Sequence, residues 1–493
     1  MVRTFVLFLV SVFLLCGCKE ATSGVIPGEP PATGISMPRK EIRGVWIATV
    51  DRMDWPRNVS DIAAQKQEYI DYLDLFKQYN VNAVIMQIRP MADAFYDSSL
   101  EPWSQYITGT QGRNPGYDVL RFMIDEAHKR GLEFHAWMNP YRISNNYTTF
   151  RPAENHIYKK HPEWTMKYDK LLMFRPALPE VRQFMVDVID DLITKYDVDG
   201  IHFDDYFYPY PKKGFEIDDQ GDFVTYGSGY ATIEDFRRGN VNKVIEDIHN
   251  LIVEKRPDIV FSISPYGVWR NQKDDPDGSD SSSSLTNYDD LYADIRLWCQ
   301  KGWIDLVVPQ LYASTENIAM NFIKMSEWWA HNSYDCPVAI GHGVYRFGNP
   351  AEGQIYMDPM QLETQFFYAR RHEEIAGSFL FNATVFTANK LDILSNLSKV
   401  YKQKSLIPFM GRNTCKEPET VSGLAVSGRT LSWTSQGEGM RYVVYKIADN
   451  KASIADIVTA NSYTCTDAGS YAVTALNGDN RESGLSDIKS IKQ

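Results

Sequence analysis

The run Ile201-His202-Phe203-Asp204-Asp205 begins with apolar side chains and ends in two adjacent carboxyl groups. Several other β-rich runs change from apolar to polar or aromatic in the same direction. They are Val84–Arg89, Phe134–Asn139, Val307–Tyr312 and Phe379–Asn382. In a barrel of parallel strands the C-terminal strand ends carry the active site, so polar residues gather there. The pattern therefore predicts parallel strands whose ends converge on one functional face.

Working outward from this run, strand-like and helix-like segments alternate from about residue 41 to residue 405. The predicted strands are 43–50, 82–89, 132–139, 199–204, 259–264, 305–312, 337–341 and 377–382. The predicted helices are 61–79, 117–130, 180–196, 233–255, 287–301, 317–332, 361–374 and 390–402. Eight such units predict an α/β fold, a TIM (β/α)8 barrel with enlarged loops. A doubly wound sheet is the alternative, but no Gly-rich phosphate loop follows any of these strands.

The first 40 residues have the composition of an export signal and a tether. Arg3 precedes an apolar run too short to span a bilayer as a helix, and the run ends in Leu15-Cys16-Gly17-Cys18. This ending resembles the bacterial lipoprotein signal, which implies cleavage before Cys18 and lipidation of its thiol. Residues 1–18 are thus expected to be a signal peptide, and residues 19–40 a flexible tether. An ordinary cleaved signal is the alternative.

The segment 415–493 changes to an all-β pattern. Alternating runs around Trp433, Tyr442–Tyr445 and Tyr471–Val473 resemble a fibronectin type III sandwich. A small all-β sandwich is therefore expected after the barrel. Cys415 and Cys465 are candidates for a disulfide bridge, which the sequence cannot establish. No Cys or Cys/His spacing suggests zinc, so no metal or other cofactor is expected.

Composition limits the partners. The 493 residues carry 51 Lys+Arg against 63 Asp+Glu, a net charge of −12, which disfavours a nucleic-acid partner. Aromatic residues make up 13% of the chain and supply flat apolar faces on which sugar rings can stack. The oligomeric state is left open.

The strongest candidate for chemistry is the pair Asp204 and Asp205 at the end of the fourth strand. Two adjacent carboxylates cannot both be buried cheaply as anions, which raises the pKa of one of them. Glycosidases need two carboxyl groups, one to protonate the leaving oxygen and one to attack or to activate water. The structural alternatives are that one Asp caps the following loop or that the pair binds a cation.

The strand ends carry motifs by which the chain resembles a known family. Motifs at most strand ends resemble the glycosyl-hydrolase-like 10 family, once catalogued as a family of unknown function. They include Arg43–Trp46, Glu101–Ser104, Pro115–Asp118, His135–Arg142, Asp204–Pro209, Ser264–Trp269 and Pro309–Tyr312. The resemblance covers about residues 41–403. It implies an exported, lipid-anchored bacterial glycoside hydrolase that cleaves peptidoglycan glycan strands, preferentially those stripped of stem peptides.

A weaker similarity concerns the general acid. Chitinase-like enzymes carry an Asp-Gly-x-Asp-x-Asp-x-Glu run at the fourth strand, but Tyr206 stands here where their acid Glu would be. Their mechanism, in which the N-acetyl group of the substrate is the nucleophile, is therefore not carried over intact. The general acid is expected to be Asp205 or a residue of another loop, and the loop candidates are Glu101 and Glu316.

Sugar-binding side chains are expected around these carboxyl groups. The candidates are Arg89, Trp103, Trp137, Asn139, Tyr141, Arg142, His202, Tyr206, Tyr266, Trp269, Gln310 and Tyr312. The expected partners are a polysaccharide or peptidoglycan glycan and, through the lipid anchor, a membrane of the bacterial cell envelope. The alternatives are a non-catalytic glycan-binding lipoprotein, a deacetylase, or a polysaccharide lyase using Tyr206 near His202. Whether the anomeric configuration is retained or inverted is left open.

Overall fold

The eight strands predicted from the sequence close into a parallel barrel in the computed structural model, which describes residues 34–411 and 413–492. Around the barrel the order is β1-β11-β10-β9-β8-β7-β3-β2. The strands are β1 (Ile42–Ile47), β2 (Ala83–Arg89), β3 (Glu133–Met138), β7 (Gly200–Phe203), β8 (Val260–Ile263), β9 (Leu306–Val307), β10 (Val338–His342) and β11 (Ile375–Leu380). The TIM-barrel prediction is confirmed.

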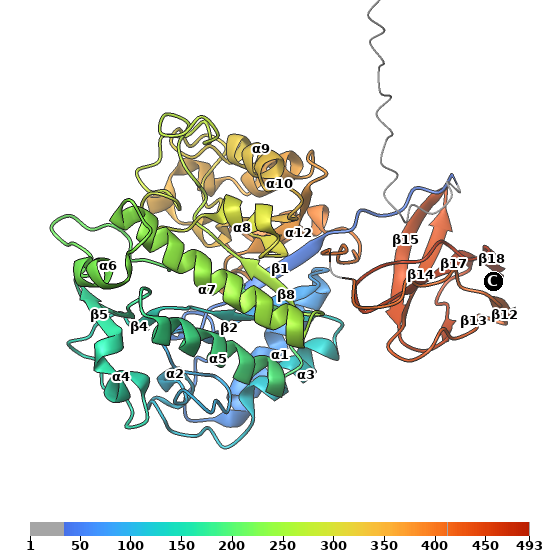
Figure 1. Cartoon of the computed structure of the whole chain (residues 1–493). Coiled ribbons are helices and arrows are strands. Elements are labelled where there is room, and N and C mark those ends of the chain that lie inside the picture. The colour runs from blue at the N-terminus through green and yellow to red at the C-terminus, as the bar shows by residue number, and fades with distance from the viewer. Residues whose placement is uncertain (1–33, 412, 493) are drawn as a thin grey trace, which may run out of the picture.

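Helices cover the outside of the barrel (Figure 1). The longer ones are α1 (Ile62–Gln78), α3 (Val119–His128), α5 (Pro179–Lys195), α7 (Ile233–Lys255), α8 (Ile295–Lys301), α9 (Phe322–Asn332), α10 (Met360–Ala369) and α12 (Ile393–Val400). The short helices are α2 (Gln105–Thr108), α4 (Ile157–Lys160), α6 (Gln220–Tyr226) and α11 (Thr384–Ala388). Side-chain caps start several of them: Asp61 accepts from Ala64 N–H, and Asp118 from Arg121 N–H.

Most elements are somewhat shorter than predicted, and two have less than half of the predicted length. The predicted strand 305–312 is regular only over Leu306–Val307, because Pro309 has no N–H to donate to a neighbouring strand. Gln310 nevertheless pairs with Tyr266 and Gly341 through isolated bridges, which holds it in the barrel wall. The predicted helix 287–301 begins only at Ile295, where Asp294 caps it.

The core has two layers. A large cluster fills the space between the barrel and its helices, and a smaller one, including Ile85, Leu306 and Phe379, fills the barrel interior. Gly200 at the start of β7 makes room for a buried imidazole, since a Cβ there would lie 2.2 Å from Nδ1 of His135. Only a glycine lets the two neighbouring strands pack at this point.

An antiparallel sheet after β3 was not predicted. It contains β4 (Arg142–Ser144), β6 (Leu171–Phe174) and β5 (Thr165–Tyr168), in that order. With α6 it extends the barrel on the left of Figure 1. Its first residue, Arg142, belongs to the candidate site.

The C-terminal residues form two antiparallel sheets. One has the order β12 (Ala425–Ser427), β13 (Thr430–Ser432), β16 (Ser462–Thr464); the other has the order β15 (Lys451–Val458), β14 (Arg441–Ala448), β17 (Gly469–Leu476), β18 (Lys489–Ile491). A cluster including Leu431, Trp433 and Val473 packs between them. Cys415 and Cys465 are both free thiols, so the candidate bridge is not formed.

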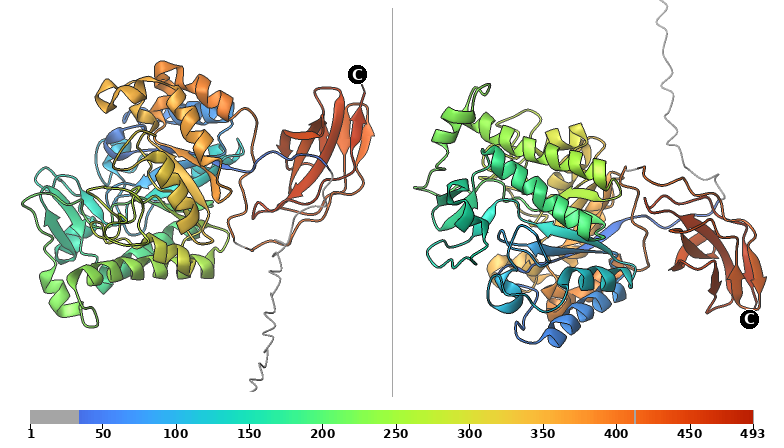
Figure 2. Two further views of the ribbon diagram at one scale, coloured as in Figure 1. Left: turned by 90° about the horizontal axis from the view of Figure 1, so that it is seen from above. Right: turned by 60° about the horizontal axis from the view of Figure 1, so that its bottom comes forward.

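The small sheets lie beside the barrel on the side away from β4, β5 and α6, as all views show (Figures 1 and 2). Asn480 donates to the carboxylate of Glu133 at 2.9 Å, and the guanidinium of Arg481 lies 4.2 Å from the ring centre of Phe409. Glu133 is the first residue of β3. The small sheets therefore contact the N-terminal end of the barrel, opposite the strand ends that carry Asp204 and Asp205.

The expected N-terminal signal peptide and tether are only partly covered by the described residues. The expected signal peptide, Cys18 and the tether up to residue 33 lie outside the described residues. The expectation of a flexible tether up to residue 40 is corrected at its end: Ser36 N–H donates to the carbonyl of Asn450, and Lys40 pairs with Glu482. Among residues 34–411 and 413–492, no helix combines the length and apolar character needed to cross a membrane.

Candidate active site

A cavity of about 170 Å³ opens at the C-terminal ends of the barrel strands. Its polar lining comes from the ends of β2, β3, β7, β8 and β9 and from β4. The lining residues are Trp46, Ala48, Val50, Met53, Gln87, Trp137, Arg142, Asp204, Asp205, Tyr206, Ser264, Gln310, Tyr312 and Phe381. Seven of the predicted site residues are thus brought together: Trp137, Arg142, Asp204, Asp205, Tyr206, Gln310 and Tyr312.

Asp204 follows the last residue of β7 and is held by donors from β3 and the loop after it. Nε1 of Trp137 donates to Oδ2 of Asp204 at 3.0 Å, and Nδ2 of Asn139 lies 3.2 and 3.3 Å from the two carboxylate oxygens. Burial raises the pKa of Asp204, while the charge of Arg142 and these hydrogen bonds oppose that rise. The donors and Arg142 thus favour the ionised form of this carboxyl group.

Asp205 lies beside Asp204 but has a different environment. Burial and the neighbouring charge of Asp204 raise the pKa of Asp205 to about 7. The hydroxyl of Tyr210 donates to Oδ2 of Asp205. Asp205 can therefore hold a proton up to about neutral pH, which is the property of a general acid.

Aromatic rings form one wall of the cavity. Tyr312 stacks on Phe381 with ring centres 5.7 Å apart and planes at 22°, and Phe381 in turn contacts Trp46 and Trp137 edge-on. Also in the cavity lining, the guanidinium of Arg142 lies 4.7 Å from the ring centre of the exposed Tyr206. Apolar faces with a few polar groups are typical of a sugar-binding pocket.

Gln87 presents a free donor to the cavity. Its Oε1 accepts from the backbone N–H groups of Thr49 and Val50 at 3.0 and 2.9 Å, which fixes the orientation of the amide. Its Nε2 is fully buried and has no hydrogen-bond partner among the described residues. An unpaired buried donor is costly unless a ligand satisfies it. Gln87 was recognised in the sequence as a polar strand-end residue but was not among the expected substrate contacts.

Arg89 and Glu101 form an ion pair away from the cavity lining. Nε and Nη2 of Arg89 lie 2.7 and 2.5 Å from the two carboxylate oxygens of Glu101, and both side chains are fully buried. Nη1 of Arg89 also donates to the carbonyls of Asn139 and Pro140. The geometry corrects the expectation that Glu101 supplies the acid and Arg89 contacts the glycan, since each already has its partners. The pair instead positions the end of β3.

His202 points into the barrel interior and not into the cavity. Its ring nitrogens contact Ser262 at 2.8 Å and Ser264 at 3.0 Å, and Nε1 of Trp46 donates to its Nε2 at 3.1 Å. Burial lowers the pKa of His202 well below its usual range. The expected contact of His202 with substrate is therefore wrong. A Tyr206/His202 base for a lyase is not supported either, because this imidazole is enclosed.

The remaining candidates lie outside the cavity lining. Tyr141 and Trp269 are buried in the core, and Trp103 packs against it. The hydroxyl of the half-buried Tyr266 contacts Ser283 at 3.1 Å, and Glu316 is exposed. These residues are not substrate contacts of the cavity as it stands. Asn139 also lies outside the lining but contacts Asp204 directly.

Trp46, Phe381 and Tyr210 belong to the site but, like Gln87, were not among the expected site residues. Trp46 and Phe381 read as ordinary apolar strand residues, and only barrel closure brings them together. Tyr210 lies in the Tyr206–Tyr210 stretch of aromatic residues, where no spacing rule distinguishes the ring that reaches Asp205. The density of Tyr in this loop was the one available signal.

A closed parallel barrel with two buried carboxyl groups of different environment at its mouth is the arrangement of a glycoside hydrolase. The chain belongs to the glycosyl hydrolase-like 10 family, whose sequence profile matches residues 41–358. It is 44% identical over 377 residues to glycosyl hydrolase YngK of Bacillus subtilis, covering 75% of this chain and 74% of that protein. It is 34% identical over 410 residues to glycosyl hydrolase DigH of Escherichia coli K12, covering 77% and 92%.

Solved structures are more distant. The glycoside hydrolase domain of PgaB (BpsB) from Bordetella bronchiseptica has a TM-score of 0.49 at 14% identity and covers 75% of this chain and 100% of that domain. An α-L-fucosidase isoenzyme 2 from Paenibacillus thiaminolyticus has a TM-score of 0.45 at 13% identity and covers 73% and 49%.

Proposed function

We propose that this glycoside hydrolase cleaves cell-wall glycan with Asp205 as general acid and Asp204 as the ionised carboxylate. The single observation that carries this assignment is the difference between their surroundings. Burial raises the pKa of both carboxyl groups, but two side-chain donors and the charge of Arg142 oppose that rise at Asp204. At Asp205 the charge of Asp204 adds to it and brings the pKa to about 7. Two carboxyl groups whose environments differ in this way can divide the acid and base roles.

The proposed reaction uses the chain's own groups. Asp205 transfers its proton to the leaving glycosidic oxygen as the bond to the anomeric carbon breaks. Asp204 stabilises the positive charge that develops, either directly or through a 2-acetamido group of the sugar. Water then adds to the anomeric carbon, and its proton returns to the Asp205 carboxylate.

The proposed substrate is peptidoglycan glycan, in particular strands that lack stem peptides. The family resemblance supports this substrate, and so do an aromatic wall for sugar faces and a cation, Arg142, that can receive a lactyl carboxylate. A non-catalytic glycan-binding role is the alternative from outside enzymology. No observation favours it over hydrolysis.

The test is incubation of the full chain with intact and with peptide-stripped peptidoglycan, followed by mass analysis of the products. We expect new reducing ends mainly from the stripped glycan. Asp204→Asn and Asp205→Asn should lower their yield by about 10²-fold or more while glycan binding is retained. Glu316→Gln is the matched control and should cleave normally, because that carboxylate is exposed and outside the cavity. Binding without any release of reducing ends by the wild-type chain would support the non-catalytic role.

We also propose a location and an organisation. Cys18 is the lipidated residue of a protein held in the bacterial cell envelope, with a signal peptide over 1–18. The tether begins at residue 19 and ends before Ser36, where the chain pairs with the small sheets. The barrel spans 41–405, and a fibronectin type III-like spacer spans 415–493. Metabolic labelling with a fatty-acid analogue tests the anchor: label should enter the wild-type chain and be absent from Cys18→Ala.

A further inference from the structure

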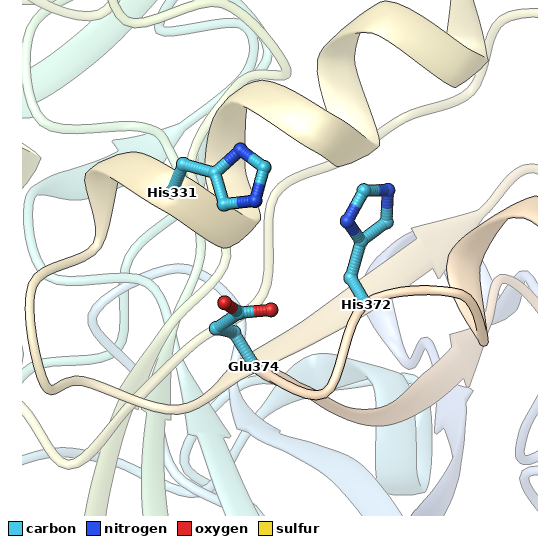
Figure 3. A group of neighbouring side chains, drawn as sticks. All are labelled: His331, His372 and Glu374. Carbon is cyan, nitrogen blue, oxygen red and sulfur yellow. The ribbon is translucent and has the colours of Figure 1, made fainter. Parts of the chain in front are cut away.

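Three potential metal ligands lie side by side (Figure 3). They are next to the start of β11, so they are at the end of the barrel opposite the cavity. His331 is in the last turn of α9, and His372 and Glu374 lie in the link between α10 and β11. One ligand atom from each residue lies within 4.8 Å of the other two. The two imidazole rings are edge-on, with centres 5.5 Å apart and planes at 83°.

These three side chains are not used in other polar interactions of the described residues. Within residues 34–411 and 413–492, none of the three makes a hydrogen bond or ion pair with another protein group. His331 and Glu374 are exposed and His372 is half-buried. Glu374 also lines an open depression of about 520 Å³, through which an ion can reach the group.

The backbone that carries two of the ligands is held in place. The guanidinium of Arg39 donates to the carbonyls of Arg370 at 2.9 Å, His372 at 3.2 Å and Ile375 at 2.7 Å. The third ligand is on a regular helix. Side-chain rotations alone are then needed to bring the ligand atoms to metal-bonding distance, about 2.0–2.2 Å from the ion.

The donor set identifies the class of ion. Two imidazole nitrogens and one carboxylate oxygen suit Zn²⁺, with water in the fourth position of a tetrahedron. Mg²⁺ and Ca²⁺ prefer oxygen ligands throughout. We propose that His331, His372 and Glu374 form a binding site for a divalent transition-metal ion of the zinc type.

The ion would join the end of α9 to the start of β11 and so stabilise the N-terminal end of the barrel. It would not take part in glycan cleavage, because the cavity lies at the other end. The residue positions explain why the sequence shows no metal motif: His331 is far from His372 in the chain, and only the packing of α9 against α10 brings them together. This inference does not depend on the proposed substrate.

The test uses the full chain without a histidine tag, stripped with EDTA and titrated with ZnCl2 by calorimetry. We expect one equivalent to bind and to raise the melting temperature. His331→Ala, His372→Ala and Glu374→Gln each remove a direct ligand. They should therefore weaken binding by at least the roughly 10- to 100-fold that loss of an outer-shell partner costs, and abolish that rise. Circular dichroism of each variant without metal reports whether it has folded.

Two controls remove comparable groups outside the triad. Glu373→Gln takes away the adjacent carboxylate, and His161→Ala takes away an exposed imidazole that pairs with Glu163. Both should bind zinc like the wild type. The proposal is overturned if the wild-type chain fails to bind one equivalent, or if folded triad variants bind as tightly as these controls.

Discussion

The indole N–H of Trp137 donates to Oδ2 of Asp204 at 3.0 Å, from the strand that pairs with β7 in the barrel wall. The register that places Trp137 opposite His202 brings the indole to the carboxylate two residues further along. A hydrogen bond to an ionised carboxylate favours the charged form and lowers its pKa. Trp137 is therefore a wall of the cavity and also a determinant of the charge on Asp204.

Trp137→Phe should move the acidic limb of the pH profile of kcat/KM to higher pH. Without the indole donor the pKa of Asp204 rises further, so the carboxylate is lost at a higher pH as the solution is acidified. The measurement is the pH profile on peptide-stripped glycan. Trp269→Phe is the matched control, since its Nε1 donates to Asp294 and not to the site. Equal shifts in the two variants would refute this role of Trp137.

The basic limb should reflect Asp205. Its pKa of about 7 means that the proton needed for the leaving group is lost as the pH rises through neutrality, so activity falls there. Asp205→Asn should remove this limb and lower kcat by about 10²- to 10⁴-fold. Activity on an aryl glycoside with a good leaving group should fall much less, because that bond needs little protonation. A uniform loss on both substrates would contradict the acid role.

Arg89→Met should destabilise the fold by about 3–5 kcal/mol, because it leaves the Glu101 carboxylate buried without its partner. The double variant Arg89→Met with Glu101→Leu should recover most of this loss. Urea denaturation followed by tryptophan fluorescence measures both. Lys159→Met breaks an exposed pair with Glu154 and should cost within about 1 kcal/mol. If Arg89→Met costs no more than this control, the pair does not support the end of β3.

Gln87→Glu removes the free amide donor and adds an ionisable carboxyl group to the cavity that Asp204 and Asp205 line. The variant keeps an oxygen for the Thr49 and Val50 N–H groups but replaces the cavity-facing N–H with an acceptor. We expect kcat/KM on stripped glycan to fall by at least about 2- to 10-fold, the value of one neutral hydrogen bond. Gln87→Met loses both functions and should also destabilise the fold. Unchanged kinetics in a folded Gln87→Glu variant would show that the substrate does not use this donor.

The barrel was predictable because each buried strand is a short apolar run followed by an amphipathic helix. The sheet of β4, β5 and β6 was missed because it interrupts this alternation with short antiparallel strands. Strand β9 was overextended because its apolar run continues through Pro309, which cannot donate to a ladder. The local pattern of apolar residues thus predicts which segments form strands, but it does not predict the residue at which the pairing of two strands ends.

The site was predictable only in part. Asp204, Asp205 and Trp137 follow from their positions at strand ends. His202 lies two residues before Asp204 and points to the same side of β7, but deeper in the barrel, where Ser262 and Ser264 satisfy it. Depth along the barrel axis depends on the stagger of neighbouring strands, which no single run reveals. For the same reason the sequence predicts that Arg89 binds the ligand, whereas in the structure it is buried in an ion pair with Glu101.

The N-terminal segment pairs with the small sheets before it enters the barrel. Ser36 N–H donates to the carbonyl of Asn450 at 2.8 Å, and Lys40 forms an ion pair with Glu482 at 2.8 Å. Going away from residue 36, the small sheets therefore come first, then the N-terminal end of the barrel, and the mouth of the cavity is farthest. If the tether is fixed to a surface, the opening points outward from it, and a long polymer can pass across the mouth without meeting the support.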